Sequence, residues 1–107
     1  MVTPIIPHVL PIVIKLFPKS PAQQEAIRLL QQECGKNLPG CENENPMTPL
    51  LKRIRFAALK VSEGDIEKLR SAVTLAKKDW RDLLVVAGFE NDPDAAEQWA
   101  QQLTTKR

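Results

Sequence analysis

The chain contains one histidine, two cysteines, four glycines and no tyrosine, and this scarcity restricts the chemistry that it can support. It has no Gly-x-Ser-x-Gly elbow, no glycine-rich loop of the kind that cradles phosphate, and neither an HExxH nor a CxxC motif. The only histidine, His8, stands among prolines, and its spacing to Cys34, Cys41 and Glu42 matches no standard zinc pattern. We therefore expect no catalytic activity, no cofactor and no bound metal.

A long apolar run is also lacking. The most apolar N-terminal stretch, PIIPHVLPIVIKLFP at residues 4–18, is broken by four prolines, follows no basic cluster and has no signal cleavage site. We therefore expect a cytoplasmic protein that does not enter the membrane. In the cytoplasm, Cys34 and Cys41 are expected to be reduced thiols. In an oxidising compartment, the turn between them would let the two sulfurs form a disulfide.

Charge of one sign is scarce as well. Fifteen Lys and Arg residues against thirteen Asp and Glu residues give a net charge of +2, which by itself indicates no polyanionic partner. Aromatic side chains are limited to two tryptophans and three phenylalanines, too few for a stacking surface that binds single strands. A hydrophobic content of 43% and a charged content of 26% are typical of a globular domain, and 107 residues suit one small domain.

Proline is plentiful, but almost all of it precedes residue 50, and only Pro93 follows. This distribution predicts three parts: a proline-rich extended arm at residues 1–20, one helix with a Gly/Asn/Pro loop at 21–46, and a compact helical module at 47–104. Within the arm, IVIKLF at residues 12–17 could form one strand, but no second strand is evident. A chain that begins at Met47 is expected to fold on its own.

Capping residues and apolar spacing predict the first helices. Ser20 as N-cap and Pro21 at the first helical position indicate a helix that extends to about Cys34, where Gly35 ends it. A second helix is predicted over residues 50–61. Its apolar stripe consists of Leu50, Ile54, Ala57, Ala58 and Val61.

Two further helices follow from the same signals. Ser62 with Asp65 resembles a capping box that begins a helix over residues 63–78. Asp92 as N-cap, with Pro93 at the first position, begins the last helix. The apolar face of that helix is formed by Ala96, Trp99, Ala100 and Leu103. The expected fold is all-α, a small bundle of four to five short helices.

The segment DWRDLLVVAGF at residues 79–89 predicts one more helix within this bundle. Asp79 is placed to accept backbone amide hydrogen bonds as N-cap, and Gly88 to end the helix in the left-handed conformation. Gly88 at that position makes Leu84 and Phe89 the pair that packs together in a Schellman motif. Asp79, Gly88 and Phe89 are therefore each explained by a structural role at the ends of this helix.

The sides of this helix are unequal in polarity. Trp80 lies with Leu83, Leu84 and Ala87 around one centre, and Val85 and Val86 cover much of the other side, so the helix is expected to be mostly buried. Only Arg81 and Asp82 project as polar residues. We expect them to form hydrogen bonds or an ion pair at the rim, since an Arg-Asp pair with no His, Cys or Ser beside it is a weak catalytic signal.

The predicted helix 50–61 is the strongest candidate for function. It carries four cations and no acid, and two large apolar side chains lie opposite its apolar stripe. The candidate residues are Lys52, Arg53, Arg55, Phe56, Leu59 and Lys60. Either the helix is sandwiched, with the basic side chains reaching out to water, or it presents a basic and apolar face outward to a protein or to phosphates.

Residues 50–99 resemble a group of short bacterial proteins in which a run like RIRFAALK leads into a DWRDLLVVAGF type of segment and a closing Trp. The resemblance implies a compact helical module and brings no activity or functional residue with it. The proline-rich half has no counterpart in that resemblance.

The favoured function is a protein-protein interaction module without catalytic activity, which binds a protein partner or itself. It would bind through helix 50–61, and the arm 1–20 offers a second contact route. The alternative is a non-specific nucleic-acid-binding accessory protein that uses the same basic helix. A helix-turn-helix is not favoured, because WRDLLVVA offers only Arg81 and Asp82 to base edges.

Overall fold

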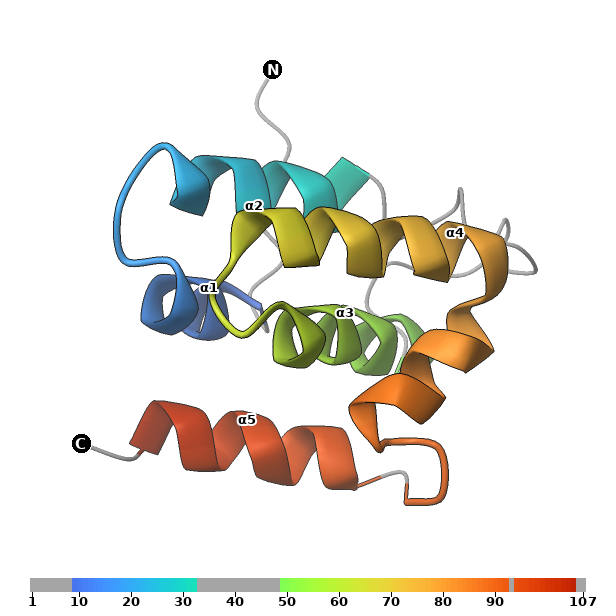
Figure 1. Ribbon diagram of the computed structural model, residues 1–107. Helices are drawn as coiled ribbons and strands as arrows, with labels where there is room; N and C mark the ends of the chain where they lie inside the picture. Colours follow the sequence, from blue (N-terminus) through green and yellow to red (C-terminus); the bar gives the residue numbers. More distant parts are fainter. Residues whose placement is uncertain (1–8, 33–48, 93, 106–107) are drawn as a thin grey trace.

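The computed structural model describes residues 9–32, 49–92 and 94–105. These residues form only helices and no strand, so the prediction of an all-α fold is confirmed (Figure 1). The helices are α1 (Leu10–Leu16), α2 (Ala22–Gln32), α3 (Pro49–Ser62), α4 (Ile66–Ala87) and α5 (Ala95–Thr105). The predicted Cys34 and Cys41 thiols lie outside the described residues.

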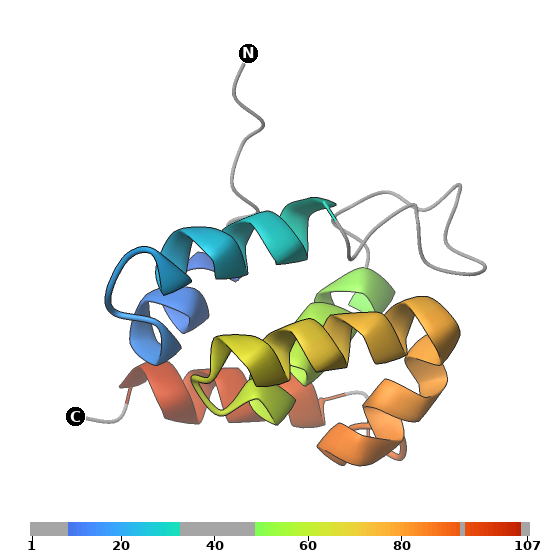
Figure 2. The same ribbon diagram turned by 45° about the horizontal axis from the view of Figure 1, so that its top comes forward.

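The helix α3 is the centre of the bundle. It packs against α1, α4 and α5, while α2 covers α1 and α4 (Figures 1 and 2). The residues of α3 that are at most 2% exposed include Leu51, Ile54, Arg55, Phe56, Ala57, Ala58, Leu59 and Ser62. Such a run of buried positions covers more than one face of a helix, so α3 is enclosed by its neighbours rather than lying on top of them.

The prediction of an extended arm is wrong for residues 10–16, which form α1, and the strand alternative at 12–17 is wrong as well. Pro11 lies in the first turn of α1, where its missing N–H has no intrahelical acceptor to lose. Pro18 comes only after the helix has ended. Ile12, Val13 and Phe17 are 0–2% exposed, and this burial favours the helix. The prediction for residues 1–8 falls outside the described part of the chain.

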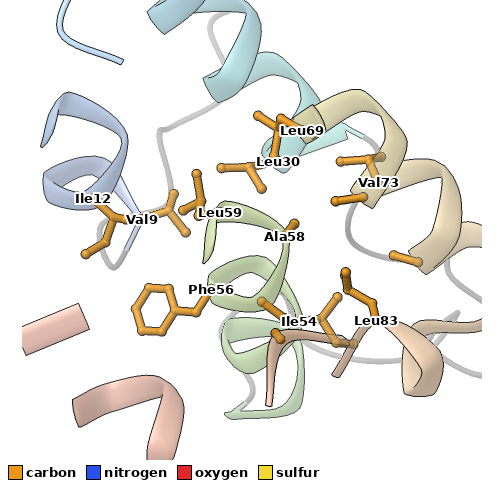
Figure 3. Packing of buried hydrophobic residues seen from close by; sticks show 14 of the residues in the cluster. Val9, Ile12, Leu30, Ile54, Phe56, Ala58, Leu59, Leu69, Val73 and Leu83 are labelled. Carbon is orange, nitrogen blue, oxygen red and sulfur yellow. The ribbon is translucent and has the colours of Figure 1, made fainter. Parts of the chain in front are cut away.

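The helices α1 and α2 contribute to the same hydrophobic core as α3, α4 and α5. In Figure 3, Leu30 of α2 lies beside Leu69 of α4, and Val9, just before α1, lies beside Leu59 of α3. The described part of residues 1–46 therefore packs directly on the predicted module 47–104.

The turn between α3 and α4 corrects the predicted capping box. Glu63 and Gly64 have positive φ angles of 52° and 81°, so the helix cannot begin at residue 63. The N-cap is Asp65, which accepts hydrogen bonds from the backbone amides of Glu67 and Lys68. The hydroxyl of Ser62 is buried and donates to the carbonyl of Leu59 at 2.6 Å, within α3.

A kink divides α4 into the two helical segments that the sequence predicts. Asp79 has φ −161° and ψ 101°, outside the helical range, and its carboxylate accepts from the amide of Arg81 at 3.1 Å. At the other end Gly88 has φ 80°, its amide donates to Val85, and the amide of Phe89 donates to Leu84. These are the two hydrogen bonds of a Schellman motif, so both predicted caps are confirmed.

The predicted last helix is found, and its expected first residue, Pro93, lies outside the described residues. The Asp92 carboxylate accepts from the amide of Asp94 at 2.9 Å, and α5 follows from Ala95. Ala96 and Ala100 of the expected apolar face are buried, while Trp99 and Leu103 are partly buried against the core. In Figure 1, α5 lies on the side of the bundle opposite α2.

Candidate interaction surface

The two apolar side chains that were predicted to face outward from α3 are buried. Phe56 and Leu59 are 2% and 0% exposed, and Arg55 is 1% exposed. Figure 3 shows Phe56 directed toward α5 and Leu59 directed toward Val9. The prediction of an exposed basic and apolar surface is therefore corrected to its alternative, a sandwiched helix, because α1 and α5 cover the side opposite α4.

Aromatic contacts explain the placement of Phe56. Its ring meets that of Trp99 edge-on, with centroids 6.3 Å apart, and Trp99 in turn lies 6.2 Å from the ring of Phe89. These three rings join α3, α5 and the end of α4. Such contacts add stabilisation beyond the buried area alone, so Trp99 acts as a core anchor.

The cations of α3 are largely engaged within the molecule. Lys52 forms an ion pair with Glu97 of α5 and lies 5.8 Å from the Phe56 ring. Lys60 donates to the carbonyl of Ala87 at 2.8 Å. Arg53 is half-buried, and its Nε is buried without a hydrogen-bond partner among the described residues. The charges of Lys52 and Lys60 thus link helices instead of forming a free basic stripe.

Among the described residues, the large apolar side chains that are exposed are Ile14 of α1 and two valines in the second segment of α4. Val85 is 56% exposed and Val86 is 62% exposed. The expectation of a mostly buried helix is therefore wrong on this side. Figure 1 shows that the segment turns away from the first half of α4 at the kink, which leaves one side facing solvent.

Arg81 and Asp82, the secondary candidates from the sequence, are exposed on the same side of this segment. They lie one turn before Val85 and Val86, and residues four apart are neighbours on a helix surface. We call these four residues the α4 face. The Arg81 guanidinium is 3.4 Å from the Asp79 carboxylate, and its side chain is 76% exposed, so this ion pair holds it weakly.

Charged side chains lie at both ends of the α4 face, and those near the kink are of both signs, because Asp82 is exposed beside Arg81 and Asp79 pairs with Arg81. Lys78 and Arg81 are exposed near the kink, and Glu90, Asp92 and Asp94 are exposed beyond the C-terminal cap. The two valines therefore lie between groups of charged residues. An apolar centre within a charged rim is the usual arrangement of a protein interface.

A second cluster of charges joins α2 to α4. Both oxygens of the Glu25 carboxylate accept from Arg28, at 2.8 and 2.6 Å, and one also accepts from Arg70 at 3.4 Å. The hydrogen bonds from Arg28 are the main cause that lowers the pKa of Glu25 from 4.5 to about 2, and Arg70 adds to this effect. Arg70 also pairs with Glu67, so the four groups balance in charge and stabilise the packing of the two helices.

The sequence indicated Arg81 and Asp82 but missed the exposure of Val85 and Val86. Five apolar residues in succession are typical of burial, and only the kink at Asp79 decides which side meets the core. The predicted N-cap at Asp79 was the available signal, because a new helix that begins there is free to change direction.

The chain matches no family model, no curated protein and no solved structure. The resemblance of residues 50–99 to short bacterial proteins therefore stays a prediction. In the described ranges no three of His, Cys, Asp and Glu lie together as a metal site would require. No described helix has the length and apolar character needed to cross a membrane.

Proposed function

We propose that this chain is a protein-interaction module without catalytic activity, and that it binds through the α4 face of Arg81, Asp82, Val85 and Val86. The observation that carries the proposal is the 56% and 62% exposure of two adjacent valines on a rigid helix. Single exposed apolar residues are common on soluble proteins, but adjacent ones between charged residues favour an interface.

The helix that carries the α4 face is fixed before any partner binds. Asp79 and Gly88 cap its ends, and Leu83, Leu84 and Ala87 anchor its inner side at 0–5% exposure. A surface that is already ordered loses little conformational entropy on association. A valine side chain also loses little conformational entropy on association, because it has a single, restricted torsion angle.

The character of the α4 face favours a protein partner over nucleic acid. Phosphate contacts require several cations directed outward, and this face sets one arginine beside one aspartate around two apolar side chains. Lys52 and Lys60, which the nucleic-acid alternative would use, are engaged by Glu97 and by the Ala87 carbonyl.

A photo-crosslinking residue at position 86, in cells that express the protein, tests the proposal. The matched control is the same residue at position 74, since Thr74 is exposed on the first segment of the same helix. We expect protein adducts from position 86 that are missing from position 74. Adducts to nucleic acid, or the same faint products from both positions, would contradict the proposal.

A further inference from the structure

We draw no further inference here: the strongest candidate, the surface patch that Val85 and Val86 form on the second segment of α4, belongs to the site already described, and nothing in the structure shows what covers it.

Discussion

The ammonium group of Lys60 donates a hydrogen bond to the carbonyl oxygen of Ala87 at 2.8 Å and lies 4.9 Å from the centre of the Phe89 ring. The last carbonyls of a helix have no amide partner within it and carry partial negative charge. Lys60 of α3 therefore acts as a C-terminal cap of α4 that comes from a neighbouring helix, next to the cap at Gly88. A cation that the sequence pattern assigned to a binding surface acts here as a link between two helices.

Substitution of this lysine tests the link. Lys60→Met keeps the length of the side chain and its contact with Phe89 but removes the donor and the charge. We expect the free energy of unfolding to fall by about 1 kcal/mol, since a hydrogen bond from a charged group and the helix dipole are both lost. Urea denaturation followed by circular dichroism measures this change. The control is Lys19→Met, at an exposed lysine before α2, and a loss no larger than in that control would refute the link.

Two glycines with the same left-handed backbone conformation provide a second prediction, one in the turn between α3 and α4 and the other at the end of α4. Gly64 and Gly88 have φ angles of 81° and 80°, which cost roughly 1–2 kcal/mol for a residue with a Cβ atom. At Gly64 a Cβ would also lie 3.0 Å from the backbone oxygen of Leu16, whereas at Gly88 the nearest atom is the flexible Lys60 Nζ at 3.8 Å.

Gly64→Ala should therefore destabilise the protein more than Gly88→Ala, by about 1 kcal/mol, in parallel urea titrations. The difference measures the contact between the α3–α4 turn and the end of α1. Equal losses in the two variants would mean that α1 withdraws from the turn at little cost.

Local signals in the sequence predicted most of the helices, because caps act over a few residues. Asp79, Gly88 and Asp92 each satisfy backbone groups next to them, and all three are found where the pattern placed them. The helix α1 was missed because its prolines indicated an extended chain. A proline in the first turn is compatible with a helix, and burial of Phe17 by distant residues cannot be deduced from the segment itself.

The candidate site could be predicted only in part for the same reason. The two apolar sides of α3 left open whether Phe56 was covered, and the answer depended on α1 and α5, which lie far away in the sequence. Arg81 and Asp82 were found from their polarity alone. The exposure of Val85 and Val86 depended on the direction of the chain after Asp79, which no local pattern encodes.

The Glu25 cluster predicts a loss of stability in acid. The folded protein holds the pKa of Glu25 at about 2, below its ordinary value of 4.5, chiefly through the hydrogen bonds from Arg28. A carboxyl whose pKa is lowered by folding stabilises the protein above its unfolded pKa, and this contribution is lost as the pH falls toward the folded pKa. The urea midpoint should therefore decline between about pH 4.5 and about pH 2.

Two variants assign the acid effect to this cluster. Glu25→Gln should lower stability at neutral pH and make the acid decline shallower. Replacement of both Arg28 and Arg70 by Gln should reduce the decline in the same way while the carboxyl remains. A decline as steep as that of the parent protein in both variants would place the acid sensitivity at other carboxyl groups.

Packing of α2 on α4 leads to the last prediction, which concerns the limits of the folding unit. Leu30 is fully buried and lies beside Leu69, so Leu30→Ala should cost about 3 kcal/mol. Both tryptophans, Trp80 and Trp99, belong to the segment 47–104, so their fluorescence follows the unfolding of that segment. We expect fluorescence and circular dichroism to shift together to lower urea, because one core includes all the helices. An unshifted fluorescence transition would instead show that α3, α4 and α5 unfold independently of α2.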